Sequence, residues 1–226
     1  MRESEPKTSR ENEVTKRDYI VAFFDDARDR ANFLLDLHRK SYRSEALTLC
    51  LVYIDSFSQW LFWPRDQSGR NFVDALVEFG GDSDYALLHP LAVIRTFATM
   101  KGQRKDFSAR VQNLFPGPQY SLLEKSEFLK RISDAFSRKE LKLLEAELWR
   151  GTIANIAYTR LRNPSVHNFG REWEISFDNT SFNGNSTRNL TFERLHWGLL
   201  GLIDEARRRS LVNNQWFGND NIVKGA

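Results

Sequence analysis

The feature that most constrains the fold of this chain is an apolar run over residues 44–63. It opens at Ser44, a residue type that caps helices, and a helix over this run is apolar on nearly every face, through Leu47, Leu49, Cys50, Leu51, Val52, Tyr53, Ile54, Phe57, Trp60, Leu61 and Phe62. A helix that is apolar all round is stable only when other elements cover it. The run therefore predicts a helix in the middle of a bundle.

A membrane-spanning helix is the rival interpretation of this run. The polar residues Asp55, Ser56, Ser58 and Gln59 interrupt it, so it falls short of the roughly 20 apolar residues that a bilayer requires. Residues 1–16 are polar and charged, which predicts neither a secretory signal nor a membrane anchor. The single cysteine fits a reducing compartment. We therefore expect a cytoplasmic protein that does not enter a membrane.

Helical spacing of apolar residues recurs along the rest of the chain. It predicts further helices over residues 15–38, 71–79, 84–99, 121–136 and 192–210. Asn71 is expected to cap the second of these helices, and Pro90 to bend the third. Ser137 and Glu140 have the spacing of a capping box, and the pattern that follows them predicts the longest helix of the chain, which ends at Arg162.

The architecture predicted from these patterns is all-α. Residues 173–177 alternate like a strand and are expected to pair with residues 190–192 in a small hairpin. The whole is a bundle of about six helices over residues 15–210 with a β-hairpin insert near the C-terminus, a flexible segment over 1–14 and a tail over 211–226. The excess of 33 Lys and Arg over 30 Asp and Glu permits a polyanionic partner without predicting one.

The motif that carries chemistry is Arg162-Asn163-Pro164-Ser165-Val166-His167, where the longest predicted helix stops. Pro164 disfavours helical geometry at Asn163, which is then expected to cap a new turn. The break allows the guanidinium of Arg162 and the imidazole of His167 to face one cleft. An always-charged cation beside a group that titrates near neutrality suits phosphodiester chemistry.

In this motif the sequence resembles the HEPN superfamily of helical domains, whose ribonuclease members carry Arg, often a polar residue, variable positions and then His. The resemblance extends in outline over residues 15–210, including the apolar helix that holds Asp55. It implies a metal-independent endoribonuclease with no cofactor, a toxin or antiviral defence effector, whose motifs meet across a homodimer to form a composite site. RNA is the implied substrate, and an antitoxin or a defence-system protein the implied further partner.

The roles that follow are acid–base chemistry at His167 and phosphate binding at Arg162. Asn163 either orients the phosphate or His167, or only caps the turn. Asp55 is either a structural hydrogen-bond acceptor or a support that steers Arg162 and His167. A stretch of cations is either a candidate RNA-binding surface or a solvated loop: Lys101, Arg104, Lys105 and Arg110. No cluster of metal ligands is visible in the sequence.

Two other interpretations of the motif stay open. A non-catalytic HEPN-like module would use Arg162 to bind RNA, a nucleotide or a protein partner. A helical interaction protein would use Arg162 only as a cation at a helix C-terminus, and His167 as a hydrogen-bonded structural residue.

Overall fold

The computed structural model describes residues 14–100, 105–115, 121–163 and 189–215. These residues are predominantly helical, and they contain isolated bridges of Leu88 with Leu123 and Thr152 but no extended strand. The all-α class is therefore confirmed for them. Within the same ranges, no helix has the length and apolar character needed to cross a membrane.

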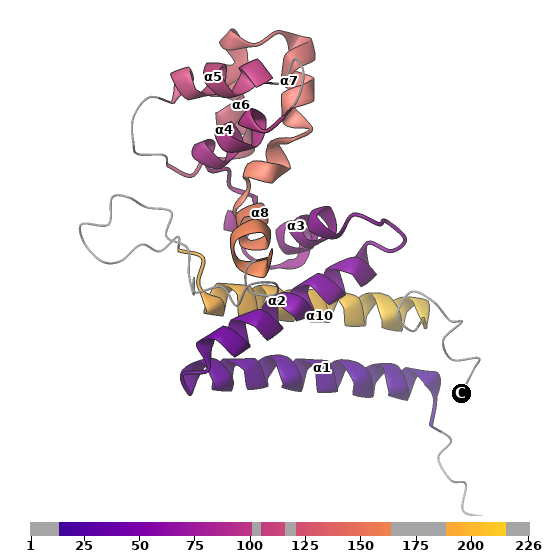
Figure 1. Cartoon of the computed structure of the whole chain (residues 1–226). Helices are drawn as coiled ribbons and strands as arrows, with labels where there is room; N and C mark the ends of the chain where they lie inside the picture. Colours follow the sequence, from indigo (N-terminus) through magenta and orange to yellow (C-terminus); the bar gives the residue numbers. More distant parts are fainter. Residues whose placement is uncertain (1–13, 101–104, 116–120, 164–188, 216–226) are drawn as a thin grey trace, which may run out of the picture.

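Four helices form the base of the molecule: α1 (Lys16–Arg39), α2 (Arg43–Leu61), α3 (Ser68–Phe79) and α10 (Phe192–Asn213). Helices α1 and α10 lie side by side and α2 crosses against both (Figure 1). Two ion pairs of 2.5 and 2.8 Å tie α1 to α10, Arg28 with Asp204 and Arg207 with Asp25. As predicted, α2 is a central helix, since it packs on α1, α3 and α10.

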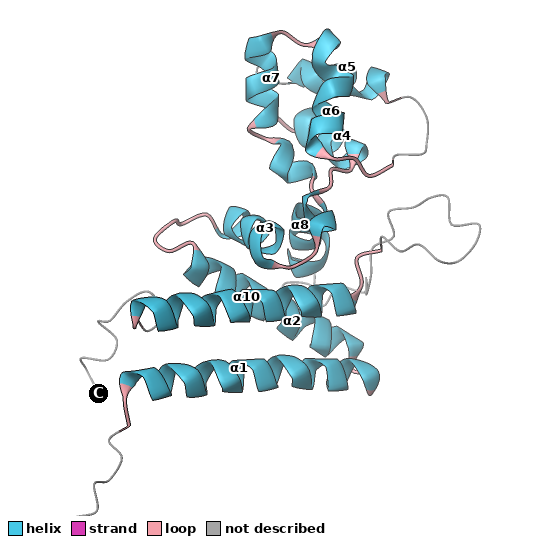
Figure 2. Cartoon of the chain, turned by 180° about the vertical axis from the view of Figure 1, so that it is seen from behind, coloured by secondary structure: helices cyan, strands magenta, loops and turns pink. Residues whose placement is uncertain are grey.

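A second group of helices lies beyond α3, on the side away from α1 (Figure 2). It consists of α4 (Pro90–Ala98), α5 (Lys105–Leu114), α6 (Lys125–Ile132) and α7 (Arg138–Glu145). These helices bury their own aromatic core around Phe97, Phe107 and Phe128. We call this group the outer cluster, and the core of α1, α2, α3, α8 (Ile153–Ile156) and α10 the basal cluster.

Several predicted helix boundaries are wrong. Helix α2 begins at Arg43 after Tyr42, and Ser44 does not cap it. Helix α3 begins at Ser68, so Asn71 lies inside it. The helix predicted over 84–99 is a 3-10 turn (Ser83–Ala86) followed by α4, which starts at Pro90; proline suits a first helical turn because it has no N–H to satisfy. The helix predicted over 121–136 is limited to Lys125–Ile132 and a 3-10 turn, Ser133–Ala135.

The longest predicted helix is in fact several short ones. Its capping box at Ser137 and Glu140 is present, but α7 ends at Glu145 and a 3-10 turn (Leu148–Gly151) follows. Gly151 packs so closely on Val93 that a Cβ atom would lie 2.2 Å from Val93 Cγ2. Thr152 then caps α8 by accepting a 3.2 Å hydrogen bond from the Asn155 N–H. Packing against the outer cluster and a new cap therefore divide the helix.

The predicted β-hairpin is not supported. Its first arm lies outside the described residues. In its second arm, the Thr191 hydroxyl accepts a 3.4 Å hydrogen bond from the Arg194 N–H, and Phe192 is the first residue of α10. Residues 190–192 therefore form no extended strand: Leu190 is a single bridge residue, Thr191 caps α10 and Phe192 belongs to the helix.

Within the outer cluster, Glu140 gives a testable link between pH and stability. Its carboxylate accepts a 2.6 Å bond from Arg110 Nη1 and also closes the Ser137 capping box, which lowers its pKa from 4.5 to about 2. A depressed carboxyl pKa stabilises the fold above the ordinary pKa, and the effect is lost as pH falls towards the folded value. We expect Glu140→Gln to lower the melting temperature at neutral pH.

The difference in melting temperature between the wild type and Glu140→Gln should shrink as the pH falls from 4.5 to about 2. Glu127→Gln is the control, because the Glu127–Arg131 pair is half exposed and lies within one helix. A difference that stays constant over this pH range would contradict the assignment.

Candidate functional site

Arg162 ends a π-helical segment, Ala157–Arg162, that continues directly from α8. The N–H of Asn163 donates to the carbonyl of Tyr158, five residues back, as a π-turn requires. Only the π-helical segment ends at Arg162, so the prediction that the helix stops there is wrong. Asn163 keeps helical dihedral angles of −65° and −49°, and the expectation that Pro164 moves it out of helical geometry is therefore wrong as well. Its N–H is already used by the π-turn, which stabilises that geometry.

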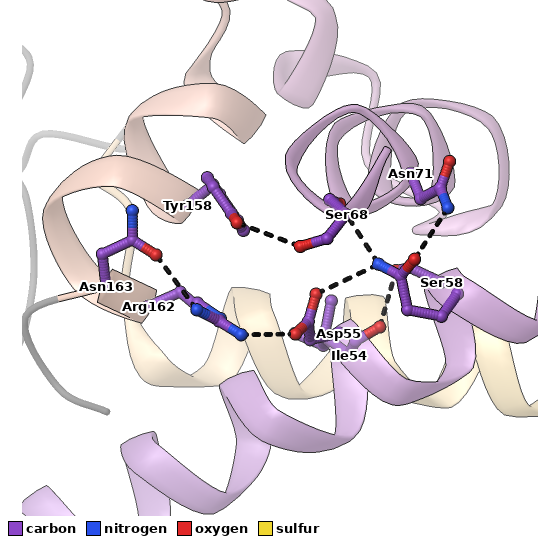
Figure 3. A network of polar contacts seen from close by, with 9 residues as sticks. Ile54, Asp55, Ser58, Ser68, Asn71, Tyr158, Arg162 and Asn163 are labelled. Atoms are coloured by element: carbon purple, nitrogen blue, oxygen red, sulfur yellow. Dashed lines mark hydrogen bonds and ion pairs between the residues drawn. The ribbon is translucent and has the colours of Figure 1, made fainter. Parts of the chain in front are cut away.

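The guanidinium of Arg162 is held by a carboxylate from a different helix. Arg162 Nη2 lies 2.6 Å from Asp55 Oδ2 on α2 (Figure 3), and the two side chains are only 19% and 16% exposed. An ion pair with so little solvent contact is weakly screened, and removal of one partner leaves the other charge poorly solvated. Of the two roles considered for Asp55, the contact fits both a structural acceptor and a support for Arg162.

Two further contacts fix the plane of the guanidinium. Arg162 Nη1 donates to Asn163 Oδ1 over 3.2 Å, and Arg162 Cζ lies 5.4 Å from the centre of the Tyr158 ring, within the range of a cation–π interaction. Arg162 Nε is buried and has no hydrogen-bond partner among the described residues. Because a guanidinium has five N–H groups, the contacts with Asp55 and Asn163 leave N–H donors for an additional anion.

The ring of Tyr158 is itself fixed by α3. The Tyr158 hydroxyl lies 3.1 Å from Ser68 Oγ, within hydrogen-bond distance (Figure 3). Gly69 makes room for the ring, since a Cβ atom there would lie 2.9 Å from Tyr158 Cε1. The absence of a side chain at position 69 therefore allows Tyr158 to lie between α3 and Arg162.

Of the predicted site residues, the structure brings Arg162, Asn163 and Asp55 together. His167 lies outside the described residues, as do Lys101 and Arg104, and Lys105 begins α5 without a described side chain. Arg110 lies on α5 in the outer cluster, whereas Arg162 ends the segment that follows α8 of the basal cluster. Arg110 donates to Glu140 and the Ala135 carbonyl and lies 4.0 Å from the centre of the Phe136 ring. These contacts account for Arg110 as a packing residue of the outer cluster.

Sequence reasoning missed Tyr158, Ser68, Gln59 and Asn71 as neighbours of the motif. A signal for two of them was present, because Tyr158 precedes Arg162 by four residues and Gln59 follows Asp55 by four, the spacing that places side chains on one helix face. No local pattern points to Ser68 or Asn71, which reach the site through the packing of α3 on α2. Among the described residues, no three His, Cys, Asp or Glu side chains form a cluster that could hold a metal ion.

The close contact of Gly69 with Tyr158 can be tested by a double-mutant cycle. We expect Gly69→Ala to destabilise the protein by about 1–3 kcal/mol, because the ring must move to admit the methyl group. In a Tyr158→Ala background the same substitution should be neutral or stabilising, since alanine favours a helix by up to about 1 kcal/mol over glycine. Denaturant unfolding of the four proteins measures both effects, and strictly additive changes would refute the contact.

No protein-family model matches this chain, and it matches no curated protein and no solved structure. The assignment of a function therefore depends on the residues around Arg162, on their contacts and on the chemistry that these permit.

Proposed function

We propose that this protein is a metal-independent endoribonuclease of HEPN type, with Arg162 and His167 in its active site. The observation that carries the proposal is the environment of Arg162. A cation with an exposed fraction of 19% is oriented by Asp55, Asn163 and Tyr158 at the first position of an Arg-x4-His motif. A preorganised guanidinium with remaining N–H donors suits a phosphate group that gains charge in a transition state.

The proposed reaction is an internal transesterification of RNA. The imidazole of His167 accepts the proton of a ribose 2′-hydroxyl, whose oxygen attacks the adjacent phosphorus while the bond from phosphorus to the 5′-oxygen breaks. The leaving oxygen takes a proton from a second imidazole, which starts in its protonated form and is supplied by the motif of the other subunit in a homodimer. Arg162 binds the phosphate through its remaining N–H groups. The products are a 2′,3′-cyclic phosphate and a 5′-hydroxyl end.

A biological role as a toxin or an antiviral effector, with an antitoxin or a defence-system partner, rests on analogy alone. The second candidate function is a non-catalytic module that binds RNA, a nucleotide or a protein. It is favoured by the 2.6 Å ion pair itself, because Asp55 neutralises part of the charge of Arg162 and gives it a structural role. The two functions differ in their dependence on His167.

The decisive experiment is incubation of structured and unstructured RNA with the protein in EDTA. We expect the wild type to yield cyclic phosphate ends and His167→Ala to be slower by about 10²- to 10⁴-fold, the usual contribution of general acid–base catalysis. Arg162→Lys should also lose most activity, because an ammonium group cannot contact Asp55 and a phosphate as a planar fork.

Two controls separate catalysis from folding and from contamination. Arg160→Lys tests a cation two residues from Arg162 outside the motif, and every variant is checked for its melting temperature and oligomeric state. The folded wild type could leave all RNAs intact and still bind them, with Arg162→Lys weakening that binding. In that case the non-catalytic binding function replaces the ribonuclease as the proposed function. Equal cleavage by the wild type and His167→Ala would refute the proposed active site.

A further inference from the structure

We infer that Gln59 and Asn71 are positioning residues that orient Asp55 and, through Asp55, the guanidinium of Arg162. The part of this inference that concerns catalysis rests on the proposed function of Arg162. The contacts on which it is based are those of the described residues alone. They form a continuous chain of hydrogen bonds from α3 to the end of the π-helical segment.

The chain starts at Arg65, whose Nε donates to Asn71 Oδ1. Asn71 Nδ2 then donates over 2.8 Å to Gln59 Oε1, and over 2.8 Å to the Arg65 carbonyl. Gln59 Nε2 in turn donates over 3.4 Å to Asp55 Oδ1 and over 3.3 Å to the Ser68 carbonyl. Asp55 uses its other oxygen, Oδ2, for Arg162 (Figure 3).

The direction of this chain is fixed at both ends. Arg65 can only donate, so the amide of Asn71 must present its oxygen to Arg65 and its nitrogen to Gln59. Gln59 then presents its oxygen to Asn71, which leaves its nitrogen facing Asp55. The carboxylate of Asp55 can only accept. Each amide therefore has one orientation that satisfies all of its neighbours.

The burial of Asn71 makes this orientation costly to change. Its side chain is fully buried, and a reversed amide would place two donors or two acceptors against each other without water to separate them. The Gln59–Asp55 hydrogen bond is long at 3.4 Å and therefore weak. The contribution of Gln59 is to point an N–H donor at Asp55 Oδ1, more than to form a strong bond. Asp55 Oδ1 is occupied in this way, and Oδ2 is directed at Arg162.

The sharpest test replaces the amide donor of Gln59 that faces Asp55 Oδ1 by an acceptor of the same shape, Gln59→Glu. At higher pH the new carboxylate and Asp55 repel each other and the restraint on Arg162 is lost. Two carboxyl groups in contact share a proton with a strongly raised pKa. On lowering the pH from about 8 to about 5, the introduced carboxyl becomes protonated and can donate to Asp55 again. Gln59→Met removes the donor at every pH and is the matched control.

The primary readout does not require RNA cleavage. It is the hydrogen-exchange rate of the Arg162 Nη2–H group that donates to Asp55, followed by ¹⁵N NMR and expressed as a ratio to the wild type at each pH. We expect Gln59→Glu to exchange about tenfold faster at high pH, the factor that one hydrogen bond to a charged group contributes, and to approach the wild type at low pH. Gln59→Met should stay fast throughout. A Gln59→Glu ratio near one at every pH would overturn the inference.

The second readout is the cleavage rate on RNA, again as a ratio to the wild type at each pH so that the titration of His167 cancels. A low ratio for Gln59→Glu that recovers at low pH supports positioning for catalysis, and a pH-independent ratio opposes it. If the exchange data show the reversal but the wild type cleaves no RNA, the proposed ribonuclease fails while the orientation of Arg162 by Gln59 stands. The two failures are therefore distinguishable.

Discussion

The burial of α2 is the constraint on which the site depends. Because this helix is covered by α1, α3 and α10, three of the polar side chains that interrupt its apolar run, Asp55, Ser58 and Gln59, are buried or partly buried and need partners within the protein. The fourth, Ser56, is exposed. Ser58 donates to the Ile54 carbonyl of its own helix over 2.6 Å. Asp55 and Gln59 require partners from elsewhere, which the π-helical segment and α3 provide. The site is thus a consequence of polar residues in a central helix.

The Arg162–Asp55 pair has the geometry that a poorly solvated ion pair needs. Desolvation of both charges opposes such a pair, and short, directed hydrogen bonds offset that cost. Here the contact is 2.6 Å, a second acceptor is supplied by Asn163, and the Tyr158 ring lies over the cation. The π-turn that precedes Asn163 is a rare backbone arrangement, one that is frequent at functional sites. Tertiary contacts of Tyr158 with Ser68 and Gly69 hold that segment in place.

The sequence predicted the features that depend on local chemistry. The apolar run identified α2 as central, the Ser137 capping box marks the start of α7, and Asp55 was singled out as a polar residue in an apolar helix. The division of the helix after Glu145 was missed because it depends on the contact of Gly151 with Val93, more than fifty residues earlier. Ser68 and Asn71 were missed for the same reason: their partners come from other elements, and helical periodicity carries no information on those pairings.

The ion pair with Asp55 and the proposed binding of a phosphate by Arg162 are compatible because of the shape of the guanidinium. Its five N–H groups point outwards in one plane along separate edges, so a carboxylate on one edge leaves the others available. Asp55 then limits the orientations of the plane, and with them the directions from which an anion can approach. A lysine at position 162 would bring one nitrogen to both anions and could not separate them in this way. Among the residues that the structure describes, Asp55 and Asn163 therefore restrict the guanidinium of Arg162 without using all of its donors, and the proposed anion site requires this combination.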